Sequence, residues 1–238
     1  IPTRSSGTVS TGNVLQNLAP IPSAEAEREP FADRPQKTGM TGPDIPESHP
    51  RYASLLTRHR IEAGVDLGIT SKQGLIAQGR GEAFDYLLGE ETIPSADAAE
   101  RAAAAHLLRA EQPVLSVNGN VAALAPGEIV ELAEATGADI EVNLFNRTDE
   151  RMERIAGHLR EHGAETVKGL TADGRIPRLD HERAKVDADG IGAADVVLVP
   201  LEDGDRAAAL AEMGKIELVV DLNPLSRSAR SATVPIVD

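Results

Sequence analysis

The second half of the chain repeats one pattern, in which a short apolar run is followed by an amphipathic stretch of helical length. The apolar runs, which we expect to be strands, are residues 114–117, 140–144, 166–170, 196–199, 218–220 and 234–237. Strands that alternate with amphipathic helices form a mostly parallel sheet covered on both faces, because each crossover helix returns the chain to the same direction. The sequence therefore predicts an α/β fold.

The first part of the chain has a different character. Eight of the 15 prolines fall within residues 1–50, and residues 1–44 carry no lasting apolar period. This composition predicts a disordered or non-native tail over 1–44. Because the chain begins at Ile1 and Met40 precedes the first ordered-looking segment, residues 1–39 are either upstream sequence or a genuine flexible tail. We expect residues 45–238 to form a single domain.

A helical segment is expected to precede the sheet. Ser48 has the character of a helix cap before a first helix, which Gly64 would end. Ser95 is the expected cap of an alanine-rich helix. Further helical patterns cover residues 70–79, 84–88, 128–136, 148–162 and 205–213.

The charge balance restricts the partners. Asp and Glu number 38 against 24 Lys and Arg, a net charge of −14, which repels a nucleic-acid backbone. No stretch approaches the ~20 apolar residues of a membrane span, so we expect neither nucleic acid nor membrane as partner. Cysteine is absent, which excludes disulfides and thiolate metal sites. An acid-rich, lysine-poor chain is typical of salt-adapted (halophilic) cytoplasmic proteins, and an ordinary acidic protein is the alternative.

Open parallel sheets bind ligands beyond the carboxyl ends of their strands, so the residues that follow 117, 144, 199 and 220 are the first candidates. Asn118, Gly119 and Asn120 follow the first strand and either offer backbone N–H groups to an anion or form a plain turn. Acidic residues within 202–205 follow another strand and either hold Mg²⁺ between phosphates or begin a helix.

Residues 221–230 are the most informative stretch. Asp221 and Asn223 come directly after an apolar strand, and Arg227 and Arg230 follow in a chain that is otherwise strongly acidic. Positive charge gathered locally in a negative molecule favours an anionic ligand.

Two further charged segments each have two interpretations. Gly79, Arg80 and Gly81 lie between helical patterns, where Arg80 either clamps a phosphate or is a surface arginine of a turn. Residues 180–187 carry His181 and Lys185 at helical spacing, either on a solvated helix or in an acid/base segment. No Walker A pattern is present, so ATP would need another architecture.

Several of these stretches together, in order, resemble the archaeal 4-phosphopantoate–β-alanine ligases (phosphopantothenate synthetases). They are residues 45–52, 74–87, 116–124, 143–148, 195–205 and 221–230. The resemblance implies a homodimer with a Rossmann-like fold. It also implies an ATP-dependent ligase of coenzyme A biosynthesis, which joins 4-phosphopantoate to β-alanine and cleaves ATP to AMP and diphosphate, with Mg²⁺ as cofactor.

The resemblance places ATP binding on Arg58, Arg80, Asp221, Leu222, Asn223, Arg227 and Ser228. We assign substrate binding to Asn118, Gly119, Asn120 and Arg147, and catalysis to His181 and Lys185. No residue is assigned as a metal ligand.

Family members continue past the last strand, so we expect this chain to be truncated at its C-terminus relative to them. The alternatives are another nucleotide-binding ligase, or a non-catalytic ATP- or anion-binding protein, on the same scaffold.

Overall fold

The computed structural model describes residues 45–201 and 203–238. The tail predicted over residues 1–44 lies outside the described residues, as does Glu202. No helix of the described part is long and apolar enough to cross a membrane.

A helical segment precedes the sheet, as predicted. It consists of α1 (Tyr52–Asp66), α2 (Lys72–Glu82), α3 (Asp85–Leu88) and α4 (Pro94–Arg109). Two predicted caps are wrong: Arg51 precedes α1 without a side-chain cap, and α4 begins one residue before Ser95, at Pro94. Proline suits a first helical turn because that turn's N–H groups have no partner within the helix. Gly64 lies inside α1 rather than after it.

The main sheet has five strands, and every pairing between neighbours in it is parallel. Its strands are β1 (Pro113–Val117), β2 (Asp139–Val142), β5 (Val196–Pro200), β6 (Ile216–Val220) and β7 (Val234–Ile236). Their order is β2-β1-β5-β6-β7, the flavodoxin-like order of a doubly wound, Rossmann-like sheet. The chain therefore leaves β1 toward one edge and later returns to pair β5 on its other side. Ligands bind at such a switch point.

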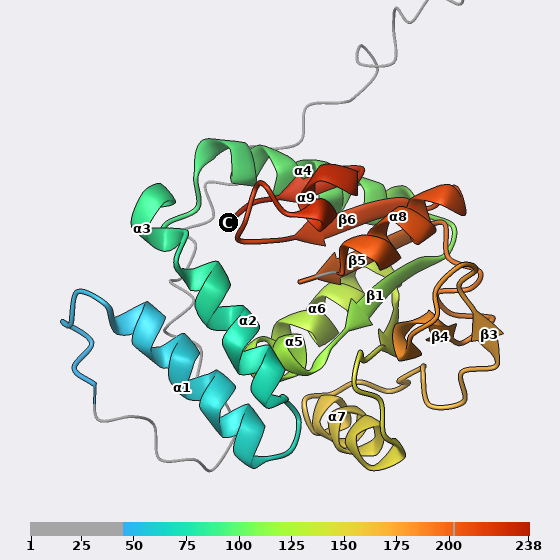
Figure 1. The fold of residues 1–238 in the computed structure, drawn as a ribbon, viewed down its shortest axis with the longest axis horizontal. Helices are drawn as coiled ribbons and strands as arrows, with labels where there is room; N and C mark the ends of the chain where they lie inside the picture. The colour runs from blue at the N-terminus through green and yellow to red at the C-terminus, as the bar shows by residue number, and fades with distance from the viewer. Residues whose placement is uncertain (1–44, 202) are drawn as a thin grey trace, which may run out of the picture. The chain divides into compact units, whose positions relative to one another are not determined.

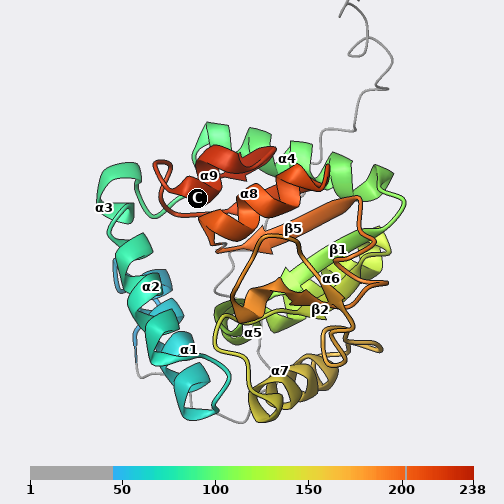
Figure 2. The ribbon, with the colours of Figure 1, turned by 45° about the vertical axis from the view of Figure 1, so that its right-hand side comes forward.

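Helices cover both faces of the sheet, which confirms the predicted α/β architecture. They are α5 (Gly119–Leu124), α6 (Pro126–Thr136), α7 (Asp149–Glu161), α8 (Gly204–Glu212) and α9 (Arg227–Ser231). Figure 2 shows α8 and α9 in front of the sheet and α4 behind it. The α1–α2 pair stands across from the carboxyl ends of β5 and β6 (Figure 1).

Alternate residues of the strands supply two separate cores, because successive side chains point to opposite faces. Leu115 and Leu198 belong to the core under α4, α6 and α7. Val114 and Val197 belong to the other core, with α8 and residues 176–194. A small antiparallel pair, β3 (Gly174–Arg175) and β4 (Lys185–Val186), lies within that second covering segment.

One predicted strand is wrong, and so is one of the two interpretations of the charged run at residues 180–187. Residues 166–170 form no strand and contribute one isolated bridge, from Lys168 to Glu141. Residues 180–187 do not form a helix but a short 3₁₀ turn, Glu182–Ala184, that leads into β4. The charged run has helical spacing, but Ala184 and Val186 are buried in the second core, and an extended backbone directs them there.

Candidate functional site

Two adjoining cavities open at the carboxyl edge of the sheet, beside the β1–β5 switch point. The larger, of about 840 Å³, is lined by α2, the loops after β5 and β6, and the start of α9. The smaller, of about 350 Å³, is lined by α2, the start of α5, and residues 144–146. Gln73, Ala77, Phe145, Arg183 and Leu201 line both cavities. The shared wall means that ligands in the two cavities would be neighbours.

The larger cavity gathers six of the seven predicted ATP-binding residues. They are Arg80, Asp221, Leu222, Asn223, Arg227 and Ser228. Residues 79–81 do not form the turn that one of their two interpretations gave, because they lie in the last part of α2. Gly81 lets α2 approach the loop after β6 closely: a Cβ atom there would lie 2.3 Å from Cδ1 of Leu222.

The loop between β6 and α9 is held by its own polar side chains. Asp221 Oδ1 accepts the N–H of Asn223 at 2.9 Å, and Asp221 Oδ2 accepts the hydroxyl of Ser226. Asn223 Oδ1 accepts the N–H of Leu225, and Ser226 Oγ caps α9 through the N–H of Ala229. These bonds fix the backbone of one wall before any ligand arrives, which lowers the entropy cost of binding.

The smaller cavity contains the predicted residues Asn118, Gly119 and Asn120. Asn118 is the N-cap of α5, because its Oδ1 accepts the N–H groups of Asn120 and Val121. Asn120 Nδ2 donates to the carbonyl of Gly74 in α2. The predicted tripeptide therefore lines the cavity, and its two amide side chains also hold α5, α2 and the strands in place.

The sequence of the sheet domain matches one family along most of its length. A family model described as phosphopantothenate/pantothenate synthetase covers residues 95–238. The chain belongs to this family. Its curated relatives include proteins of Thermococcus kodakarensis and Methanosarcina mazei, both named 4-phosphopantoate–β-alanine ligase. Each is 60% identical to this chain over 82% of its length, which corresponds to 75% and 77% of the respective relative.

Four predicted site residues of this synthetase family member lie outside the walls of both cavities. Arg58 is exposed on α1 and its Nε donates to Glu82 Oε1. Arg147 donates to the carbonyl groups of Gly169 and Leu170, at 2.7 and 3.2 Å.

The other two are the catalytic candidates. Lys185 Nζ donates to Glu182 at 2.8 Å. His181 lies one layer behind the walls: its ring centroid is 5.2 Å from that of Phe145, and its Nε2 is 3.4 Å from Oδ2 of Asp203. Their catalytic roles stay predictions.

Two arginines that the sequence analysis did not single out line the cavities. Arg183 is only 5% exposed, and its Nε donates to Oδ1 of Asn143 at 3.1 Å. Arg151 lies in the first turn of α7, where burial lowers the pKa of its guanidinium. A cation at a helix N-terminus opposes the helix dipole. That unfavourable placement is a signal in the sequence that could have marked Arg151 as a functional candidate.

The larger cavity has a wall suited to a magnesium-bound polyphosphate. Among its described lining residues, Arg80, Arg183 and Arg227 are the cations, and Asp203 and Asp221 are the carboxylates. Among the described residues no group of three or more acidic or imidazole side chains is arranged to hold a metal ion. Mg²⁺ commonly binds through one or two carboxylates together with substrate phosphates, so Asp203 and Asp221 fit that mode.

Proposed function

We propose that this protein is an ATP-dependent 4-phosphopantoate–β-alanine ligase that forms 4′-phosphopantothenate, AMP and diphosphate in coenzyme A biosynthesis. The observation that carries the proposal is the wall shared by the two cavities, in a chain 60% identical to relatives with that name. A ligase of this kind must hold a nucleotide and an acid side by side, and the two adjoining cavities provide room for both.

The reaction follows in two steps. A carboxylate oxygen of 4-phosphopantoate attacks the α-phosphorus of ATP, the bond to the β-phosphate oxygen breaks, and diphosphate leaves. The neutral amine of β-alanine then attacks the acyl carbon of the mixed anhydride, AMP leaves, and the amine gives up one proton. The protein contributes mainly positioning and stabilisation of charge at the α-phosphate.

ATP is assigned to the larger cavity. Arg80 and Arg227 supply donors for the phosphates, and the fixed loop of Asp221, Leu222 and Asn223 supplies a wall for the nucleotide. Mg²⁺, held by Asp203 and Asp221 together with the phosphates, would neutralise charge on the polyphosphate. Arg58 is still assigned to ATP binding, and this assignment rests on the family resemblance alone.

4-Phosphopantoate is assigned to the smaller cavity, where the backbone of Gly119 and the side chains of Asn118 and Asn120 form part of the wall. Arg147 directly follows Asn146 of this wall, and the carbonyl groups of Gly169 and Leu170 hold its side chain outside the cavity. His181 is positioned to act through Asp203 and Phe145.

We further propose a cytoplasmic, salt-adapted homodimer. The family resemblance supports the dimer, and the net charge of −14 supports salt adaptation. Apolar side chains exposed on α2 and α3, among them Ile76 at 64% and Leu87 at 78%, are available for a contact with a second copy. Light scattering in high salt would measure the assembly.

The test of the ligase is AMP release in high salt with ATP, Mg²⁺, 4-phosphopantoate and β-alanine, with one component omitted at a time. We expect AMP only when both organic substrates are present. ATP binding without AMP release would instead identify a non-catalytic ATP-binding protein. If the protein neither binds ATP nor releases AMP, the assignment is refuted.

A further inference from the structure

We propose that the smaller cavity binds 4-phosphopantoate in one direction, with the phosphate on Arg151 and the carboxylate on Arg183. The inference rests on the proposed function and deepens it. Its starting point is the charge of the cavity. Arg151 and Arg183 are the charged side chains among its described lining residues, and none of those described residues is an acid, although the whole chain has a net charge of −14. A wall with two cations suits a ligand with two anionic ends.

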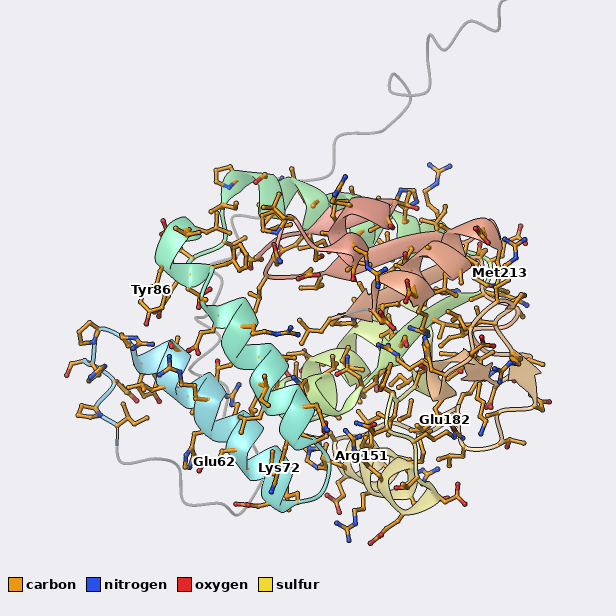
Figure 3. The ribbon with its side chains drawn as sticks, viewed as in Figure 1. Glu62, Lys72, Tyr86, Arg151, Glu182 and Met213 are labelled. Atoms are coloured by element: carbon orange, nitrogen blue, oxygen red, sulfur yellow. The ribbon has the colours of Figure 1, made fainter. Side chains whose placement is uncertain are left out.

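Arg151 lines the smaller cavity alone and is held in a fixed position. Its Nε donates to the carbonyl of Ile69 at 2.9 Å, and its Nη1 donates to the carbonyl of Asn146 at 3.1 Å. A Cβ atom on Gly119 would lie 2.4 Å from the carbonyl oxygen of Ile69 and 2.5 Å from Nη2 of Arg151, so glycine at that position leaves room for both groups. Figure 3 shows Arg151 on α7 close to the start of α2. A rigid guanidinium recognises phosphate at little cost in side-chain entropy.

Arg183 lies where the two cavities meet, because it lines both of them. Its guanidinium is bonded through Nε to Asn143, whose Nδ2 donates in turn to the carbonyl of Lys185 at 2.9 Å. A buried cation between two anionic ligands stabilises the charge that develops as they react.

The chemistry fixes the direction. The carboxylate must reach the α-phosphorus of a nucleotide in the larger cavity, so it belongs beside the residue that both cavities share. The phosphate then lies at Arg151, which lines the smaller cavity alone. The reverse direction would bring the substrate phosphate against the nucleotide phosphates and leave the reacting carboxylate far from them. Arg183 is therefore a catalytic residue, and Arg151 selects the phosphorylated acid.

The test compares steady-state kinetics of Arg151→Gln and Arg183→Gln with 4-phosphopantoate and with pantoate, which lacks the phosphate. For Arg151→Gln we expect KM for 4-phosphopantoate to rise roughly 10- to 100-fold, more than kcat falls, since one charged hydrogen-bonding partner is lost. The preference for 4-phosphopantoate over pantoate, measured as the ratio of kcat/KM values, should fall by a similar factor. For Arg183→Gln we expect kcat to fall with both 4-phosphopantoate and pantoate. The ratio of their kcat/KM values should remain that of the wild-type protein.

The matched control is Arg154→Gln, one turn along α7, where the exposed Arg154 pairs with Glu150 and lies outside both cavity walls. It should keep the wild-type KM and preference. KM and the preference do not depend on the folded fraction, so partial misfolding of a variant leaves the test valid. A lost preference in Arg183→Gln, or an unchanged KM in Arg151→Gln, would overturn the proposed direction. Absence of AMP release by the wild-type protein would instead refute the ligase assignment itself.

Discussion

The side chain of Asn118 joins β1 to the carbonyl group of Pro200 at the end of β5, with Nδ2 and the oxygen 2.8 Å apart. The same side chain caps α5 through its Oδ1. One amide thus ties together the two strands of the switch point and the helix that follows β1. It holds the boundary of the smaller cavity in shape.

The change Asn118→Asp separates these two roles. Aspartate is an equally good cap, but it offers the Pro200 carbonyl an acceptor instead of a donor. We expect the free energy of unfolding to fall by about 1–3 kcal/mol, measured by urea denaturation. Asn223→Asp is the control, because its Oδ1 bond to the N–H of Leu225 survives the change. Equal stability of the two variants would show that the link to Pro200 contributes nothing.

Two glycines of α2 differ in their surroundings and provide a matched pair. A Cβ atom on Gly81 would meet Leu222, whereas a Cβ atom on Gly79 would meet nothing within 4 Å. We expect Gly81→Ala to displace the loop after β6 and raise KM for ATP about tenfold. Gly79→Ala should leave KM for ATP unchanged and stabilise the fold by about 0.5–1 kcal/mol, since alanine loses less entropy in a helix. Equal KM values in the two variants would argue against nucleotide binding beside Leu222.

Glu141 makes stability depend on pH. Burial raises the pKa of its carboxyl from 4.5 to about 7, although the N–H groups of Asp187 and Ile191 donate to it. Between pH 4.5 and about 7, the carboxyl of Glu141 is therefore protonated in the folded state and ionised in the unfolded state. The contribution of Glu141 is fully present below pH 4.5 and is lost as the pH rises through 7.

Glu141→Gln isolates this effect, because glutamine does not titrate. The wild-type stability relative to the variant should decrease by roughly 3 kcal/mol as the pH rises from below 4.5 to above 7, measured by urea denaturation across that range. A difference that stays constant with pH would mean that the carboxyl keeps its ordinary pKa in the fold.

Lys185 tests the catalytic assignment made from the sequence. Its Nζ pairs with Glu182 and it lines neither cavity. We expect Lys185→Met to change kcat/KM for 4-phosphopantoate by at most about fivefold, the range of a surface ion pair. A fall of kcat comparable to that of Arg183→Gln would restore Lys185 as a catalytic residue.

Much of the architecture could be predicted because its causes are local. Thr148 was expected at the start of α7 and caps that helix, and Gly137 closes α6 in the left-handed conformation with φ 70°. The predictions failed where tertiary packing overrode local spacing. A helix was one of the two interpretations of residues 180–187, but Ala184 and Val186 are buried in a core, and the segment forms a 3₁₀ turn and a short strand.

The sequence by itself determined that the strands run parallel and that polar groups gather at their carboxyl ends. Both features depend on residues that are close together in the chain: the spacing of apolar residues, and the polar residues that directly follow each strand. It also placed Arg80 and Asp221 among the nucleotide-binding candidates through the family resemblance. Only the tertiary structure decided that Arg183 rather than Lys185 lines the cavities, and that Arg151 reaches the smaller cavity from α7. Those positions depend on contacts between segments far apart in the chain, and local sequence patterns do not record where such segments meet.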